Sequence, residues 1–181
     1  MTGKGHRLTG VGAGLFAAAF VHVLGYDYTA EILAALAAAS STTLPDWAEI
    51  TRYKKGVRAG TFIPHRTITH WPVLWLGLMY AAFHYLDPYP AAIVLGICVG
   101  ALAHIVADAP NPMGVPILWP HKRVSFFGGL WRSGEFEKSM TFVFTVVGLG
   151  FWAYAHNETP FIQTLIASWN DTISWFMSLR Q

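Results

Sequence analysis

Residues 91–108 read AAIVLGICVGALAHIVAD, an apolar run that ends in a carboxylate. A helix of this length crosses most of the hydrocarbon core of a bilayer, which takes about 20 residues. Three further runs of similar composition occupy residues 11–26, 71–86 and 140–154. The four runs predict membrane-spanning helices.

Two other segments are less apolar. Residues 28–44 are rich in alanine, with Glu31 near their start. We expect a span there, packed inside a bundle, because small side chains let helices approach closely. Residues 161–179 place apolar side chains on one helical face and Asp171 on another, which suits an interfacial helix or a sixth span. The sequence therefore predicts an all-α fold, a polytopic membrane helix bundle of five to six transmembrane or interfacial helices in one membrane-embedded domain, residues 1–181.

The composition argues against other classes of protein. Of the 181 residues, 54% are hydrophobic and 12% are charged, whereas about 25% are charged in soluble domains. A soluble domain with a single core is therefore not expected. The net charge of +2 is too small to indicate a nucleic-acid partner, and one cysteine, Cys98, provides no disulfide framework.

The lysines and arginines predict the orientation in the membrane. If the five segments from residue 11 to residue 154 cross in turn, eleven of the twelve fall on one side. They lie in the N-terminal segment and in two long polar loops, residues 41–70 and 108–139. Loops rich in lysine and arginine stay in the cytoplasm. We therefore expect a cytoplasmic N-terminus and two cytoplasmic loops that fold over the inner mouth of the bundle.

Histidines and carboxylates gather on the same predicted side. The group comprises His6, Asp46, Glu49, His65, His70, His104, Asp108 and His121. His104 and Asp108 are four residues apart, so they share one helix face and can reach each other or a common ion. A neutral histidine bonded to a carboxylate at the helix end explains this pair equally well.

The segment HRTITH, residues 65–70, places two histidines around an arginine just before a span. In a turn that leads into a helix, both imidazoles can converge on one centre. The guanidinium of Arg66 can hold a phosphate or a carboxylate with its two-pronged geometry. A basic cluster on lipid headgroups would explain the arginine, but it gives no reason for the two imidazoles.

Asp46 closes the alanine-rich segment and His6 precedes the first run, and neither is informative alone. Together, however, histidines and two aspartates from four separate stretches reach one membrane face. Such a mixed ligand set suits zinc, manganese or iron and leaves room for metal-activated water. Structural roles are expected for three further histidines, each alone in or beside an apolar helix: His22, His84 and His156.

Five short elements also follow one another in a distinctive order. They are His6 with Gly10, LPD at 44–46, HRTITH at 65–70, HIVAD at 104–108, and GVPILWP at 114–120 with Arg123. In this order they resemble the bacterial inner-membrane metal-dependent hydrolases of the YdjM type. The resemblance covers roughly residues 1–125, with residues 139–181 as additional C-terminal helices. It implies a multi-pass protein of the bacterial inner membrane with a metal-dependent hydrolytic site.

The resemblance also implies roles for individual residues. The candidate metal ligands are His6, Asp46, His65, His70, His104 and Asp108. His6 and Asp46 are also candidate acid/base groups, and Arg66 and Arg123 are candidate anion contacts. The chain departs from the family pattern in two places. Asp46 is followed by Trp47 and Ala48, so a second carboxylate is missing unless Glu49 replaces it, and Trp71 stands where serine is common.

The leading hypothesis is a membrane-bound hydrolase with its site at the cytoplasmic face. It would act on a phosphoester or a lipid-linked phosphate through metal-activated water. The expected cofactor is a divalent ion, zinc before manganese or iron, and the expected partner is membrane lipid. A non-enzymatic membrane scaffold or adaptor with a structural metal or histidine cluster is the alternative, and the missing carboxylate after Asp46 favours it. A transporter or ion pathway ranks last, because few ionisable residues lie deep in the predicted spans.

Overall fold

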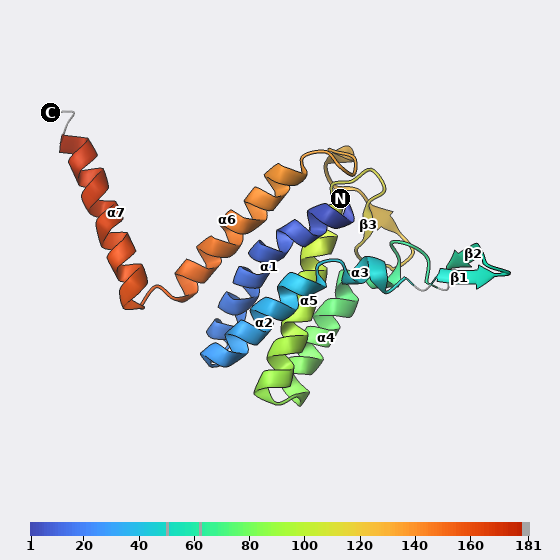
Figure 1. The fold of residues 1–181 in the computed structure, drawn as a ribbon, viewed down its shortest axis with the longest axis horizontal. Helices are drawn as coiled ribbons and strands as arrows, with labels where there is room; N and C mark the ends of the chain where they lie inside the picture. The colour runs from blue at the N-terminus through green and yellow to red at the C-terminus, as the bar shows by residue number, and fades with distance from the viewer. Residues whose placement is uncertain (50, 62, 179–181) are drawn as a thin grey trace.

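The computed structural model describes residues 1–49, 51–61 and 63–178. Helices make up most of this part of the chain, and its strands form two short antiparallel pairs (Figure 1). The prediction of an all-α fold is therefore confirmed.

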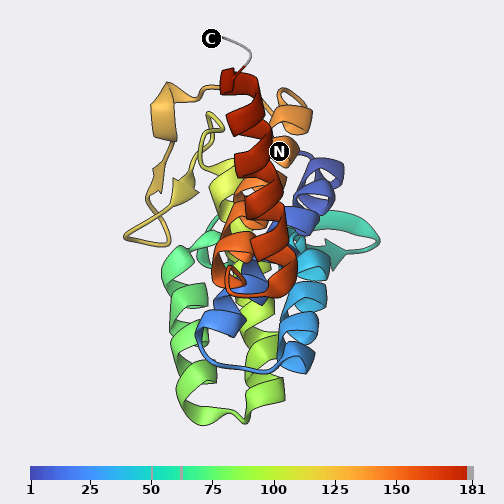
Figure 2. The same ribbon diagram turned by 90° about the vertical axis from the view of Figure 1, so that its left-hand side faces the viewer.

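Five long helices pack together, and a sixth extends away from them. The packed helices are α1 (Gly3–Val23), α2 (Tyr28–Ser41), α4 (Pro72–Tyr85), α5 (Pro88–Asp108) and α6 (Glu137–Ala155). α5 lies at the centre in contact with α1, α2 and α4, and α6 runs along α1. The last helix, α7 (Pro160–Ser178), bends by 111° from α6. It projects away from the bundle in Figure 1 and therefore lies in front of it in Figure 2.

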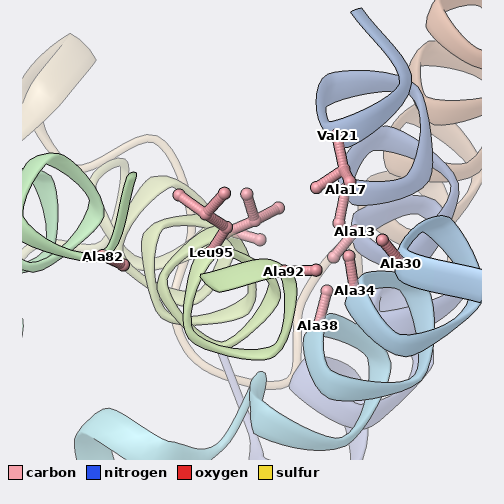
Figure 3. Packing of buried hydrophobic residues seen from close by; sticks show 11 residues of the cluster. Ala13, Ala17, Val21, Ala30, Ala34, Ala38, Ala82, Ala92 and Leu95 are labelled. Carbon is pink, nitrogen blue, oxygen red and sulfur yellow. The ribbon is translucent and has the colours of Figure 1, made fainter. Parts of the chain in front are cut away.

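Small side chains allow α1, α2 and α5 to approach closely. Ala13, Ala34 and Ala92 meet at the contact of the three helices (Figure 3). A Cβ atom on Gly96 of α5 would overlap the carbonyl oxygen of Ala34 on α2. α2 therefore packs closely against α1 and α5, as its alanine content predicts, while Ile32 and Leu36 on its other face are exposed.

One described helix is long and apolar enough to cross a membrane by itself. It is α5, with 21 residues and a mean hydropathy of 2.2. α6 and α7 pass the same test only as a bent pair. α2 and α4 have 14 residues each and reach about 21 Å, less than the roughly 30 Å of a hydrocarbon core. The arrangement of five to six spans therefore stays a prediction.

The two long polar loops lie at the same end of the bundle, beside the N-terminus of α1 and the C-terminus of α5 (Figure 1). Their regular elements are all short. They are α3 (Leu44–Trp47), β1 (Thr51–Lys54), β2 (Val57–Thr61), η1 (Ile68–His70), β3 (Val115–Pro116), β4 (Arg123–Val124) and η2 (Phe126–Gly128). This end of the bundle carries the candidate site.

Candidate metal centre

Four separate segments bring histidines and carboxylates together at this end. His6 comes from α1, Asp46 from α3, His70 from η1, and His104 and Asp108 from the end of α5. All three imidazoles are fully buried, Asp108 is buried, and Asp46 is about one-third exposed. The predicted convergence is therefore present in the described chain.

Two indoles hold η1 in place beside α5. The Nε1 atom of Trp75 donates to the carbonyl oxygen of Thr69 at 2.8 Å, and Nε1 of Trp71 donates to Ile117 O at 3.1 Å. Pro72 then opens α4, where a missing N–H costs nothing. Trp71, one of the two departures from the family pattern, thus anchors η1 to the loop that follows α5.

Three ligand atoms form a compact triangle at the centre. Nε2 of His70 lies 3.1 Å from Nε2 of His104 and 3.3 Å from Oδ1 of Asp46. The third side, from His104 Nε2 to Asp46 Oδ1, measures 3.5 Å. Atoms that bind one zinc ion at about 2.0–2.1 Å lie roughly 3 to 3.5 Å from one another. The triangle has the dimensions of a metal-ligand set.

The hydrogen bonding of His104 aims an electron pair into this triangle. Its Nδ1 lies 2.7 Å from the carbonyl oxygen of Thr42, which can only accept, so the proton of the neutral ring is on Nδ1. A histidine that ligates a metal commonly donates its other N–H in this way. Oδ1 of Asp46 is buried and has no contact of hydrogen-bond geometry in the described chain. A proton on His70 Nε2 can form a hydrogen bond to only one of the other two atoms. A cation at the centre can bind all three.

The charge states suit a cation too. Burial opposes ionisation of Asp46, but the imidazoles of His104 and His70 outweigh it, since they can carry the positive charge here when no ion is bound, so the pKa of this carboxyl lies well below its usual range. Burial is the main reason that the pKa of His70 is lowered, so its imidazole is neutral at pH 7. An ionised carboxylate between neutral imidazoles is the form in which these groups bind metals.

Asp108 is held by other cations. Nη2 of Arg66 lies 2.5 Å from Oδ2 of Asp108, and the amino group of Met1 pairs with Oδ1. Arg66 also donates from Nη1 to Gly114 O at 3.0 Å. Nε2 of His104 is 3.8 Å from Oδ2. Asp108 therefore joins the cluster with much of its charge already balanced, and Arg66, predicted as an anion contact, binds this aspartate.

His6 packs against the triangle. Its ring stacks on His104 with centroids 3.7 Å apart. Nε2 lies 3.4 Å from Oδ1 of Asp108, yet neither ring nitrogen has a hydrogen-bond partner among the described residues. An unsatisfied buried nitrogen is costly. A shared ion or a water molecule would satisfy it.

Glu49 lies close to the position of the missing carboxylate. Its Oε1 accepts from His65 Nδ1 at 2.6 Å and from the backbone N–H of Arg66 at 3.2 Å, and it lies 3.8 Å from His70 Nδ1. Ligand atoms of Asp46, Glu49, His65 and His70 all lie within 4.8 Å of one another, as do those of a second group, His6, His104 and Asp108. The two groups meet at the triangle.

Other predicted residues lie outside the cluster. Arg123 is exposed on β4 and pairs through its backbone with Pro116, so its role stays a prediction. His121 is exposed in the same loop. His84 contacts the rings of Tyr80 and Phe83. Sequence reasoning missed the carbonyl oxygen of Thr42, which accepts from His104 Nδ1. A backbone acceptor leaves no signal in the side-chain pattern.

Comparisons with known proteins agree with this picture. The family described as YdjM inner membrane protein matches residues 1–178. The Inner membrane protein YdjM of Escherichia coli (strain K12) and the protein of the same name from Shigella flexneri are each 40% identical over 60 residues. That stretch covers 31% of this chain and 30% of each relative. No solved structure matches the chain.

Proposed function

This chain belongs to the YdjM inner membrane protein family, and we propose that it is a membrane-bound metal-dependent hydrolase with its site at the cytoplasmic face. Family membership confirms the resemblance drawn from the motifs and supports an inner-membrane location. The triangle of His70, His104 and Asp46 carries the proposal, because its sides of 3.1 to 3.5 Å match a metal-ligand set.

The proposed topology is multi-pass, with one domain over residues 1–181 and a cytoplasmic N-terminus. The distribution of lysine and arginine supports this orientation. α5 supplies one span, and its C-terminal end carries His104 and Asp108. Both polar loops gather at that end (Figure 1). The cluster then lies at the height of the cytoplasmic headgroups.

The ligand set consists of His70, His104 and Asp46, with His6 and Asp108 beside it. When bound, a divalent ion lowers the pKa of a coordinated water and polarises the scissile bond. Two imidazoles and a carboxylate suit zinc, and also manganese or iron. The carbonyl of Thr42 fixes the tautomer of His104, so this ligand is aimed before any ion binds.

His65 is the better placed acid/base group. It is about half exposed, whereas His6 is fully buried and out of reach of a substrate. Its Nδ1 is bound by Oε1 of Glu49 at 2.6 Å. A carboxylate in that position orients the imidazole ring. Nε2 of His65 would then accept and return the proton during hydrolysis.

We propose a lipid-linked phosphate or another phosphoester as the substrate. An apolar pocket of about 430 Å³ is lined by residues of α1, α4, α5 and α6, among them Leu102, Ala103 and Val106 of α5. These three residues lie at the level of His104 along α5 but on other faces of the helix, so an acyl chain in the pocket would have its headgroup at the same end of the bundle as the site. Lys54 and Arg123 are exposed on the loop elements at the same end, where they attract anions.

Hydrolysis tests the proposal. We expect purified protein in detergent, loaded with zinc, to release inorganic phosphate from mixed micelles of phosphatidic acid or from p-nitrophenyl phosphate. His104→Ala should abolish the release, and the control His121→Ala should preserve it, because His121 is exposed in a loop away from the triangle. Equal release by His104→Ala and the wild type would refute the proposal.

One observation favours the scaffold instead. Arg66 is buried and already bound to Asp108 and Gly114, so it offers no free guanidinium to a phosphoryl group. A structural metal needs no such contact. In that case the triangle would retain zinc, and neither substrate would be hydrolysed at any zinc concentration.

A further inference from the structure

A second cluster of ionisable side chains lies at the other end of the bundle. His22 is in the last turn of α1, Glu31 is in the first turn of α2, and His156 caps the C-terminus of α6. His22 is sixteen residues beyond His6 on α1, a separation of about 24 Å at 1.5 Å per residue. The two clusters are therefore independent.

The carboxylate of Glu31 joins the two imidazoles. Its Oε1 lies 2.7 Å from Nδ1 of His22, and its Oε2 lies 2.9 Å from Nε2 of His156. The rings of His22 and His156 stack with centroids 4.0 Å apart. Glu31 and His156 are 5% and 4% exposed. Side chains from three helix ends thus meet at one site, in which Glu31 and His156 are buried and His22 is partly exposed.

A buried carboxylate needs a positive partner, because its desolvation is otherwise very costly. Within the described residues, Glu31 forms ion pairs only with the two histidines and with no lysine or arginine. The positive charge must then come from a protonated imidazole or from a bound cation.

The second ring nitrogen of His156 favours the cation. Its Nδ1 lies 2.9 Å from the carbonyl oxygen of Trp152, which can only accept a hydrogen bond, so the neutral ring carries its proton there. Nε2 then presents an electron pair to Oε2 of Glu31, and the two would repel each other. A histidine bound to a metal through one nitrogen and to a backbone carbonyl through the other has this arrangement.

The surroundings also allow an ion to enter. A pocket of about 530 Å³ is lined by both histidines and by Asn157, Glu158 and Thr159. A protonated His156 would place its positive charge against the stacked ring of His22. A bound ion would instead be coordinated by one nitrogen of each ring. Two imidazoles and one carboxylate leave a coordination position that water from the pocket can fill.

We propose that His22, Glu31 and His156 form a second binding site for a divalent transition-metal ion, of the class that zinc represents. It lies at the end of the bundle opposite the triangle, so it acts separately from the proposed hydrolytic centre. Because it shares no residue with that centre, its existence does not depend on the hydrolase proposal.

Metal content tests this site. Full-length protein in detergent is stripped with a chelator, reloaded with zinc alone, desalted and measured by elemental analysis. We expect His156→Ala and Glu31→Gln each to lose one zinc per chain relative to the wild type, with no loss in the control His121→Ala. The zinc lost by His156→Ala should be lost equally when His104→Ala is also present, which makes the result independent of the triangle. Wild-type zinc content in both His156→Ala and Glu31→Gln would overturn the proposal and leave a buried ion pair.

Chemical protection tests the site in the wild-type chain, so it does not depend on the folding of a variant. Diethyl pyrocarbonate acylates accessible neutral imidazoles, and the side chain of His22 is 32% exposed. We expect zinc to reduce acylation of His22 at least fivefold, as measured by peptide mass spectrometry, and to leave His121 unchanged. Equal acylation of His22 with and without zinc would contradict the second site.

Discussion

Replacing Arg66 with methionine removes the main cation that faces Asp108. Arg66 is 3% exposed, and its guanidinium lies 2.5 Å from Oδ2 of Asp108 and donates to Gly114 O at 3.0 Å. Methionine replaces the aliphatic stem of arginine and has no charge, so the change leaves the buried carboxylate and the Gly114 carbonyl without this partner. We expect Arg66→Met to destabilise the fold strongly.

The expected magnitude follows from the partners that remain. Removing one member of a buried ion pair costs about 3–5 kcal/mol. Asp108 keeps the amino group of Met1 and the nearby ring of His6, so the lower end, about 3 kcal/mol, is expected. For a chain of this size 1 kcal/mol shifts the melting temperature by roughly 2–4 °C. Arg66→Met should therefore melt about 6–12 °C below the wild type.

Thermal unfolding in detergent, followed by tryptophan fluorescence, measures this shift. Arg123→Met is the matched control, because Arg123 is exposed and forms no ion pair in the described chain. The double variant Arg66→Met, Asp108→Asn should lose less stability than the sum of its single variants, because it removes both charges. A melting temperature of Arg66→Met within 1 °C of the wild type, or strict additivity in the double variant, would refute the reasoning.

Three further predictions concern the Glu49–His65 contact, the lowered pKa of His70 and the packing of α5 against α2. Glu49→Gln should retain zinc but slow phosphate release about 10–100-fold, because the ring of His65 loses its charged partner; unchanged kinetics would count against this role. Since burial lowers the pKa of His70, falling pH should release zinc from the triangle, as measured with a chromophoric chelator, below the ordinary histidine pKa of about 6.5; a midpoint at or above 6.5 would contradict this. Gly96→Ala should lower the melting temperature, since its Cβ overlaps Ala34 O, and the matched Gly77→Ala, which meets nothing within 4 Å, should not; equal melting of the two variants would show that α2 and α5 can separate freely.

Much of the site follows from local spacing. The four-residue interval between His104 and Asp108 fixes both on one helix face, and in the structure their side chains approach to 3.8 Å. The short segment from His65 to His70 predicts imidazoles near a common centre, and the two rings lie with centroids 5.5 Å apart. Alanine in residues 28–44 likewise predicts the close packing of α2.

The remainder depends on contacts between distant segments. Arg66 was expected to face an anionic ligand, but Asp108 is the anion it meets. The pairing of Glu31 with His156 joins residues 125 positions apart, and no periodicity in either segment indicates it. The sequence predicts structural roles for His22 and His156, because each stands alone in or beside its own helix. Only the packing of α1, α2 and α6 brings them to one carboxylate.

Zinc titration of the metal-free chain tests the central claim most directly. In a His156→Ala background, which removes the second proposed site, the zinc that remains reports on the triangle. We predict a tight zinc equivalent that is lost when His104→Ala is added and kept when His121→Ala is added instead. Undiminished tight binding in the His156→Ala, His104→Ala chain would contradict the claim that His70, His104 and Asp46 form a metal centre.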